Sequence, residues 1–371
     1  MRILVTGGAG FIGSHLVDEL IARGHSVRIL DRLVPQVHGE GSDWPAWVPP
    51  GVERIRADVR DEAVWPKAVN GVDAIYHFAA EVGVGQSMYE ISRYMGANTM
   101  GTAHLLEFLA QGKHNVQRLI VASSMSIYGE GFYRTASGKP VFPGVRSAKT
   151  LEARRWDEFG ASGERLIPGP TPEEKPLEPT SIYAISKRDQ EEMCLTVGRA
   201  YGIPTVALRF FNVYGPRQSL SNPYTGVAAI FASRILNGKS PIIFEDGAQG
   251  RDFVHVSDIV QAVVLALSAD AASYEPINVG TGRSTSVLAV ADTLIRLLGS
   301  TVKPEIVGQY RAGDIRYCYA DIGKARRLLG YEPRVTFEAG MRELVGWLAT
   351  QKAVDRVALA TAELAARGLT R

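Results

Sequence analysis

The chain has 371 residues, of which 46% are hydrophobic, so it can bury a core in two domains or in one large α/β domain with a smaller companion. Its 41 basic and 39 acidic residues leave a net charge of +2 without long runs of either sign, which disfavours nucleic acid as a partner. Cys194 and Cys318 suggest neither a disulfide framework nor a metal site. With no leader peptide and no apolar run of about 20 residues, we expect a cytoplasmic protein that binds no membrane.

The N-terminal stretch predicts a strand, a glycine turn and a helix that together bind a dinucleotide. Residues 2–6 (RILVT) are an apolar run typical of a parallel strand buried on both faces. The glycines that follow fit G-x-x-G-x-x-G: Gly7 permits the tight turn, Gly10 the approach of a pyrophosphate, and Gly13 close packing of helix on sheet. In residues 11–24, apolar side chains recur at helical spacing, and the N-terminus of this helix would face the phosphates.

An acidic residue at the end of the second predicted strand bears on the choice of cofactor. Asp31 ends HSVRILD, 18 residues after Gly13, where a carboxylate accepts hydrogen bonds from an adenosine ribose. The same carboxylate repels a 2′-phosphate, so NAD is favoured over NADP. Arg32, the next residue, is the feature that argues in the other direction.

Further strands and helices alternate along the first half of the chain. Strands are predicted to end near Asp58, at residues 78–80 and at Ser123–Ser124, with a helix through residues 98–110 between the last two. Repeated βα units with short connections predict a Rossmann-type, doubly wound parallel sheet. Ligands bind beyond the carboxyl ends of such strands, where these residues fall.

YAISK places Tyr183 four residues before Lys187 at the expected start of a helix, so the phenol and the ammonium share one face. A nearby ammonium favours phenolate and would lower the pKa of the tyrosine, which makes it a general base. A chance pair on a solvated face is the alternative that this motif alone leaves open.

Nine motifs, in order along the chain, resemble the nucleotide-sugar epimerases and dehydratases of the extended short-chain dehydrogenase/reductase family. They are TGGAGFIGSHL, HFAA, ANTMGT, SSMSIYG, YAISK, RFFNVYGPR, RDFVHVSDIV, NVGTG and RAGDIR, and they cover residues 1 to about 345. The resemblance implies an NAD-binding Rossmann domain at 1–210 with an insertion at about 131–180, and a smaller, mainly sugar-nucleotide-binding domain at 211–350. A helical tail is expected at 351–371.

The resemblance also assigns roles to individual residues. Ser124, Tyr183 and Lys187 would be catalytic. The cofactor would be held by Gly7, Gly10, Phe11, Ile12, Gly13, Asp31, Arg32, Asp58, Val59, Phe78, Ala79, Ala80, Asn98, Ser123, Tyr183, Lys187 and Phe210. The nucleotide sugar would contact Val84, Ser124, Ser126, Asn212, Ile242, Phe244, Arg251, Arg311 and Asp314, and no metal is expected. Forked arginine donors suit phosphate, and carboxylates suit ribose hydroxyls.

The residues after Ser124 bear on the reaction. The family's 4,6-dehydratases carry Asp-Glu there and its UDP-glucuronate decarboxylases a Glu at the second position, whereas this chain has Met125 and Ser126. Methionine transfers no proton, and an unactivated serine is a poor acid or base. This absence favours a 4-epimerase that works through a 4-keto sugar, although an acid from elsewhere could still support other chemistry.

The insertion, and the segments NPYTGVAAIF and RAGDIRYCYADI, look most like the dTDP-L-rhamnose 4-epimerase branch. The alternatives are a UDP-glucuronate 4-epimerase, an epimerase or dehydratase of another nucleotide sugar, and an NAD-binding regulatory protein without activity. The insertion is interpreted either as a substrate-selecting flap or as a surface elaboration. A homodimer is expected through the helix at 181–200, using Met193, Leu195 and Val197.

Overall fold

The computed structural model describes residues 1–39, 41, 43–220, 222, 224, 226–311, 313–351 and 357–370. Within them, a seven-stranded parallel sheet has the order β14-β9-β5-β4-β1-β2-β3. Its strands are β1 (Arg2–Thr6), β2 (Ser26–Asp31), β3 (Glu53–Arg56), β4 (Ala74–His77), β5 (Arg118–Ser124), β9 (Thr205–Phe210) and β14 (Pro276–Val279). The predicted α/β class and Rossmann-type sheet are confirmed.

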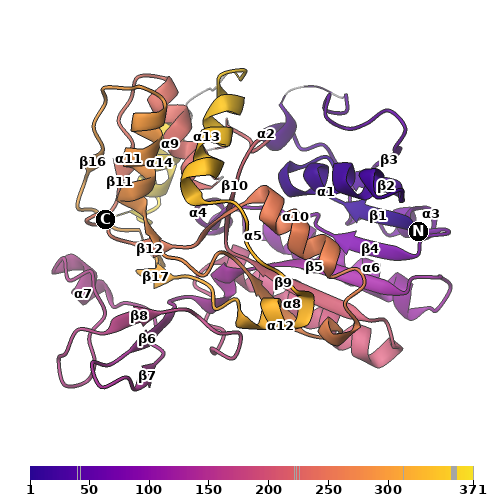
Figure 1. Ribbon diagram of the computed structural model, residues 1–371, viewed down its shortest axis with the longest axis horizontal. Coiled ribbons are helices and arrows are strands. Elements are labelled where there is room, and N and C mark those ends of the chain that lie inside the picture. Colours follow the sequence, from indigo (N-terminus) through magenta and orange to yellow (C-terminus); the bar gives the residue numbers. More distant parts are fainter. Residues whose placement is uncertain are drawn as a thin grey trace.

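Helices cover both faces of this sheet because successive strand residues point to opposite sides. On one face, Ile3 and Val5 pack against α1 (Phe11–Ala22), α10 (Val256–Leu265) and α12 (Gly323–Leu329). On the other, Leu4 packs against α3 (Trp65–Val69), α6 (Gly101–Ala110) and α8 (Ile182–Tyr201). Figure 1 shows these helices around the sheet in the right and lower parts of the molecule.

Short helical elements also connect the strands. At the carboxyl edge of the sheet they are α2 (Pro35–His38), η1 (Glu62–Val64), α4 (Val84–Ser87), α5 (Ile91–Tyr94), the π-helical η2 (Met95–Met100) and η3 (Met125–Tyr128). At the opposite edge, η4 (Asp270–Ala272) lies before β14 and beside Arg118, the first residue of β5. The strand predicted to reach residues 78–80 ends at His77. Phe78 and Ala79 leave the sheet because their N–H groups donate to Thr6 Oγ1, at 3.1 and 3.0 Å.

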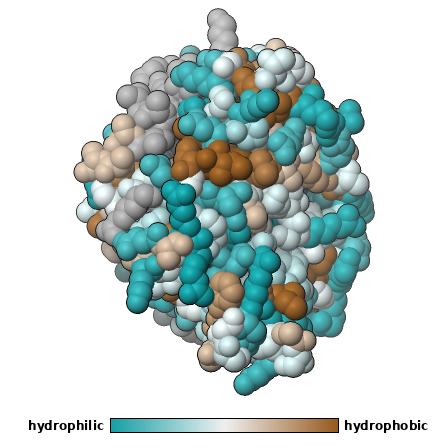
Figure 2. All heavy atoms as spheres, turned by 90° about the vertical axis from the view of Figure 1, so that its left-hand side faces the viewer, coloured by the Kyte–Doolittle hydropathy of each residue, from teal (hydrophilic) through white to brown (hydrophobic). Residues whose placement is uncertain are grey.

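A smaller layer is built from the second half of the chain, on the left of Figure 1. Its helices α9 (Val227–Leu236), α11 (Val287–Leu297) and α13 (Phe337–Leu348) share a separate core. Short strands pair around them: β10 (Asn212–Tyr214) with β13 (Phe253–His255), β11 (Ile242–Ile243) with β16 (Glu305–Ile306), and β12 (Gly250–Arg251) with both β15 (Thr285–Ser286) and β17 (Tyr317–Cys318). Figure 2 views the molecule from this side, where one group of apolar side chains lies among mainly hydrophilic ones.

The two layers do not follow a single division of the chain at residue 210. Strand β14, with α10 and α12, belongs to the large sheet although it comes from the second half. The sugar-nucleotide domain proposed for 211–350 is therefore interrupted by segments that complete the Rossmann layer.

The insertion is loop-rich, as its prolines predict, and forms a small antiparallel sheet at the lower left of Figure 1. It contains β6 (Phe132–Arg134), β7 (Pro140–Val141), α7 (Ala148–Glu152) and β8 (Ile167–Gly169). In the expected helical tail, the structure has α14 (Val357–Ala366), and residues 352–356 and 371 lie outside the described residues. Nowhere in the described part of the chain is a helix both long and apolar enough to cross a membrane.

Candidate active site

A cavity of about 670 Å³ lies between the carboxyl ends of the strands and the smaller layer. The sequence predictions converge on it. Its walls include every residue assigned above to catalysis, cofactor or nucleotide sugar, with the exception of Asn98. Residues as distant in sequence as Gly7 and Asp314 therefore share one enclosed space.

The glycine loop forms one end of the cavity, and its shape depends on having no side chains. Gly7 has φ +70°, and a Cβ there would lie 2.9 Å from the backbone nitrogen of Ala79. A Cβ on Gly13 would lie 2.2 Å from the carbonyl oxygen of Gly7. Helix α1 begins after Gly10, which gives it no side-chain cap, so the N–H groups of its first turn are available to phosphate oxygens. This cradle fits a dinucleotide pyrophosphate.

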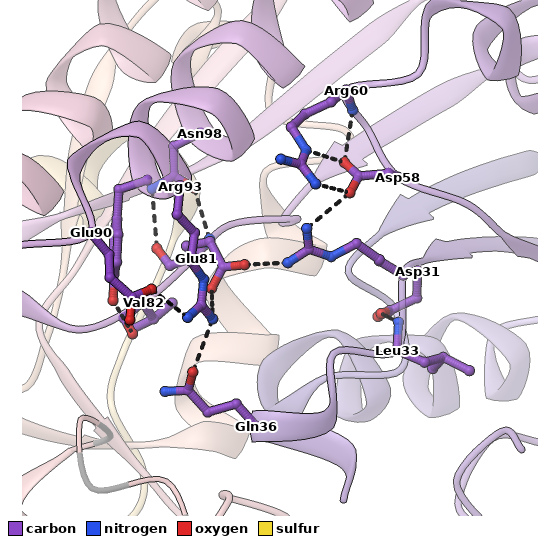
Figure 3. A network of polar contacts seen from close by, with 12 residues as sticks. Asp31, Leu33, Gln36, Asp58, Arg60, Glu81, Val82, Glu90, Arg93 and Asn98 are labelled. Atoms are coloured by element: carbon purple, nitrogen blue, oxygen red, sulfur yellow. Dashed lines mark hydrogen bonds and ion pairs between the residues drawn. The ribbon is translucent and has the colours of Figure 1, made fainter. Parts of the chain in front are cut away.

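Asp31 and Arg32 line the cavity next to the glycine loop. Figure 3 shows Asp31 with Leu33, and Asp58 and Glu81 in the neighbouring polar network. The carboxylate of Asp31 accepts hydrogen bonds from the N–H groups of Ala9 (3.1 Å) and Leu33 (2.9 Å), which fix it at the end of β2. Arg32 donates to Asp58 at 2.9 Å and also to Glu81. Because two carboxylates hold its guanidinium, Arg32 is poorly placed to attract a 2′-phosphate. The argument for NADP is thereby weakened.

We expect NAD to bind at least about 100-fold more tightly than NADP. Asp31 would face the 2′-phosphate, and like charges brought together cost several kcal/mol. Titration of cofactor-free protein with both dinucleotides measures this difference. Equal affinities would contradict the role given to Asp31.

Asn98 is buried behind the wall instead of lining it. Its Oδ1 accepts from the N–H of Glu81 (2.7 Å), while its Nδ2 donates to the Glu81 carbonyl (3.1 Å) and to Ser186 Oγ (2.9 Å). It lies in the π-helical turn η2, an irregularity often found near functional sites. Asn98 thus holds Glu81 and the start of α8 together, and any effect on the cofactor passes through them.

Tyr183, Ser124 and Ser126 come together from α8 and from the end of β5. Helix α8 begins at Ser181, whose side chain caps it by accepting from Ala184 N–H, and Tyr183 follows in the first turn. Ser124 Oγ accepts from both the backbone N–H (3.2 Å) and the hydroxyl (2.9 Å) of Ser126. The hydroxyl of Ser124 can then donate its own proton to the Tyr183 oxygen. This hydrogen bond acts to lower the pKa of Tyr183.

The expected effect of Lys187 on Tyr183 is not found among the protein's own groups. Burial raises the pKa of Tyr183, and the opposing contribution comes from Ser124. The ammonium of Lys187 donates to Gln190 Oε1 at 2.7 Å, and burial lowers its pKa to about 8. Sharing a helix face was therefore not sufficient to couple the two side chains, because Lys187 has its own partner.

Four carboxylates line the cavity among the described residues, and each is already engaged. Asp31 is held by two backbone N–H groups, and Asp58 by Arg32 and Arg60. Although burial opposes it, hydrogen bonds from Arg60 and Arg32 lower the pKa of Asp58. Glu81 is paired with Arg32 and Arg93, and Asp314 with Arg311 (2.8 Å). The lowered pKa of Asp58 makes it a poor proton donor to a sugar.

The opposite end of the cavity carries the residues expected to bind the nucleotide. The guanidinium of Arg311 lies 4.8 Å from the ring centroid of Phe244, and its Nε donates to Asp314. Arg251 donates to the carbonyls of Gly250, Ile315 and Arg316, at 2.7–3.1 Å, which fix its direction. Asn212 Oδ1 is buried and has no partner in the described part of the chain. These groups offer cations to a diphosphate and an acceptor to a hydroxyl.

Several wall residues were missed by sequence reasoning. They are Met88, Gln218, Tyr224, Gln249, Leu364 and Leu369. Gln249 lies two residues before Arg251, the first residue of the motif RDFVHVSDIV. Its closeness to that motif was a signal that could have been used. Leu364 and Leu369 lie in the tail, where no motif points to a site.

Of the described residues of the insertion, only Thr180, its last, lines the cavity, which favours the interpretation of a surface elaboration over that of a flap. Other residues of the insertion support the segments that form the nucleotide end of the cavity. Arg146 forms a buried ion pair with Glu245 (2.7 Å) and donates to the carbonyl of Asp314 (2.8 Å). Arg316 in turn pairs with Asp157 of the insertion (3.0 Å). These contacts hold the segments that carry Phe244 and Asp314.

Comparison with known proteins identifies this architecture. Residues 3–143 and 157–280 match the NAD dependent epimerase/dehydratase family. The chain belongs to this family. A dTDP-L-rhamnose 4-epimerase of Burkholderia thailandensis is 36% identical over 353 residues, which cover 94% of this chain and 95% of that protein.

Solved structures agree with this assignment. UDP-glucose 4-epimerase of Thermotoga maritima, determined with UDP-glucose, has a TM-score of 0.77 at 32% identity and covers 94% of this chain and 99% of its own. UDP-glucose 4-epimerase of Thermus thermophilus, in complex with NAD, has a TM-score of 0.73 at 32% identity, covering 95% and 100%. The protein is thus an NAD-dependent enzyme of nucleotide sugars, of the epimerase/dehydratase type.

Proposed function

We propose that this enzyme inverts C4 of a nucleotide sugar through a transient 4-keto intermediate. The observation that carries the proposal is the combination of Ser124 and Tyr183 with a cavity whose described carboxylates are all engaged elsewhere. Removing a proton from C5, or expelling a group from C6, requires an acid or base beside the sugar. Met125 and Ser126 supply none, and each carboxylate that lines the cavity among the described residues already has a partner.

Tyr183 acts as the base for the C4 hydroxyl proton, and Ser124 orients that hydroxyl and stabilises the phenolate. Bound NAD supplies a reversible hydride acceptor, so C4 can be oxidised and reduced again. The glycine loop would hold the pyrophosphate of the cofactor, and Asp31 would bind its adenosine ribose. Lys187 would donate to the other ribose. Inversion requires the keto sugar to present its opposite face while Arg251 and Arg311 hold the diphosphate.

Isotope labelling tests this assignment directly. With substrate deuterated at C4, we expect the epimer to keep its label at C4, and reaction in deuterated water should add no deuterium to carbon. NMR of the products measures both. Deuterium at C5, or loss of water or carbon dioxide, would show a dehydratase, a C5 epimerase or a decarboxylase.

For the substrate, we propose a dTDP-6-deoxyhexose such as dTDP-L-rhamnose. Support comes from the 36% identical relative of that activity and from two apolar residues that line the cavity, Val84 at the start of α4 and Met88 directly after it. Such a wall suits a C6 methyl group better than a carboxylate, whose desolvation needs a partner. UDP-glucuronate and UDP-glucose remain alternatives, since UDP-sugar epimerases are also close in structure. A panel of these nucleotide sugars, assayed for C4 inversion, decides among them.

Arg251→Ala and Arg311→Ala are expected to weaken nucleotide-sugar binding about 10- to 100-fold and to leave NAD bound. Each loses a charged hydrogen bond to phosphate, worth on the order of 1.5–3 kcal/mol. Calorimetric titration of NAD-loaded protein measures the first effect, and cofactor content after purification the second. Loss of NAD with unchanged nucleotide-sugar affinity would contradict these roles.

A homodimer through α8 stays a prediction, with one correction. Leu195 is buried in the chain's own core and cannot face a partner, whereas Met193 and Val197 are only partly buried. Analytical ultracentrifugation of a Val197→Glu variant against the wild type tests this interface.

A further inference from the structure

The C-terminal tail, which no motif assigns, reaches the wall of the active-site cavity. Leu364 and Leu369 are its contributions to that wall. Leu364 packs on α4: a Cβ added to Gly85 would lie 3.4 Å from both of its terminal methyl groups. Helix α4 also contacts the catalytic helix, because Ser87 Oγ accepts from the N–H of Tyr183 at 3.0 Å. Leu364 therefore stands at the end of the cavity where the sugar would meet Tyr183.

A polar contact anchors this part of the tail. Glu363 accepts hydrogen bonds from the hydroxyls of Tyr89 and Tyr224, each at 2.8 Å. The guanidinium of Arg367, one turn later, lies 4.2 Å from the ring centroid of Tyr89. Tyr89 follows α4, and Tyr224 precedes α9, so Glu363 joins a segment of the large layer to one of the small layer.

The last described residues reach the nucleotide end of the same cavity. Thr370 forms an isolated antiparallel bridge with Arg311, which is expected to bind the diphosphate. Between Leu364 and Leu369 the chain thus runs from the sugar end to the diphosphate end. The tail therefore contributes to the cavity wall at both of these places, whereas the insertion contributes only Thr180.

Little holds the tail in place apart from these contacts. Of residues 362–370, only Leu364, Leu369 and Thr370 are partly buried, and none belongs to a hydrophobic core. Segments with few buried apolar contacts open at low free-energy cost. A cavity that must admit and release a nucleotide sugar needs such an element.

We infer that residues 362–370 form a removable wall over the nucleotide sugar, latched by Glu363 on Tyr89 and Tyr224, and that Leu364 selects for an apolar group on the sugar. This inference rests on the proposed function, because it takes the sugar to lie beside Tyr183. With Val84 and Met88, Leu364 makes an apolar wall on this side, which disfavours a charged C6 substituent.

Two lysine substitutions on neighbouring residues test the selecting role. NAD-loaded Leu364→Lys protein should bind dTDP-L-rhamnose about tenfold more weakly than the wild type, since it places a charge in the apolar wall. The same variant should bind dTDP, which lacks the sugar, with the affinity of the wild type. Ala365→Lys adds the same charge on the exposed side of α14 and should bind both as the wild type does. Equal effects of the two substitutions, or equal losses for dTDP-L-rhamnose and dTDP, would overturn the inference.

The latch is tested without any substrate. Glu363→Ala removes the acceptor shared by two hydroxyls, so amide hydrogen exchange over residues 362–370 should quicken about tenfold, while Ala365→Lys leaves it unchanged. Unchanged exchange in Glu363→Ala would overturn the latch. If amide exchange quickens in Glu363→Ala and the wild-type protein binds no dTDP-L-rhamnose, the proposed substrate is wrong. The inference of a removable wall is then still supported.

Discussion

Tyr183→Phe is expected to lower turnover by about 10²–10⁴ with NAD still bound. The substitution keeps the ring, which packs edge-on against Tyr94 at 6.5 Å between centroids, and removes only the ionisable oxygen. Without that oxygen nothing beside Ser124 can take the C4 hydroxyl proton. Steady-state assays with the nucleotide sugar that the wild type accepts measure the loss.

The pH dependence of the rate should change in the same variant. Burial raises the pKa of Tyr183, so the wild-type rate should rise with pH as the phenolate becomes populated. The residual rate of Tyr183→Phe should lack this rise. Tyr94→Phe is the matched control: Tyr94 is buried beside Tyr183, and its hydroxyl bonds Val82 and Gln86 without lining the cavity. A Tyr94→Phe loss as large as that of Tyr183→Phe would indicate a packing effect and not base catalysis.

The half of the site that binds the cofactor was accessible from sequence because its determinants are local. A strand, a glycine turn and a helix follow one another within residues 2–22, so spacing alone locates Gly7, Gly10 and Gly13. Asp31 is found by the same logic, since parallel strands end at one edge of a sheet. The nucleotide end was located by resemblance, because Arg251 and Arg311 are brought together only by the fold.

What sequence could not provide depends on partners far apart in the chain. The neutralisation of Arg32 requires Glu81, 49 residues away, and no local pattern joins them. The seventh strand, β14, returns to the large sheet after the smaller layer has begun. Lys187 illustrates the opposite error: helical spacing placed it beside Tyr183, whereas Gln190, three residues further on, takes its ammonium.

The tail shows a third kind of limit. Its composition predicts a helix, but in sequence a helix whose leucine faces a cavity resembles one whose leucine faces solvent. Only the positions of Gly85, Tyr89 and Tyr224 reveal what Leu364 and Glu363 contact. Sequence reasoning left the insertion as either a flap or a surface elaboration, because loops often carry function, and it gave the tail no function.

Gly13→Ala is expected to abolish retention of NAD and to destabilise the protein by about 1–3 kcal/mol, although alanine is the better helix former by about 1 kcal/mol. The new Cβ would lie 2.2 Å from the Gly7 carbonyl oxygen and 2.8 Å from the Gly8 Cα, distances that real Cβ atoms do not adopt. The backbone of the turn must therefore move. That turn is expected to hold the pyrophosphate, so its displacement should remove the binding site as well as the close contact of α1 with the sheet.

Gly346→Ala provides the control for this steric argument. Gly346 also lies in a helix, α13, but is exposed, and a Cβ there would meet nothing within 4 Å. The same substitution should then stabilise the protein by about 0.5–1 kcal/mol and leave NAD bound, since helix propensity acts alone. Thermal unfolding and the cofactor content of the purified variants measure both effects. If Gly13→Ala keeps NAD and gains stability as Gly346→Ala does, the close approach of α1 to the glycine turn is not what forms the cofactor site.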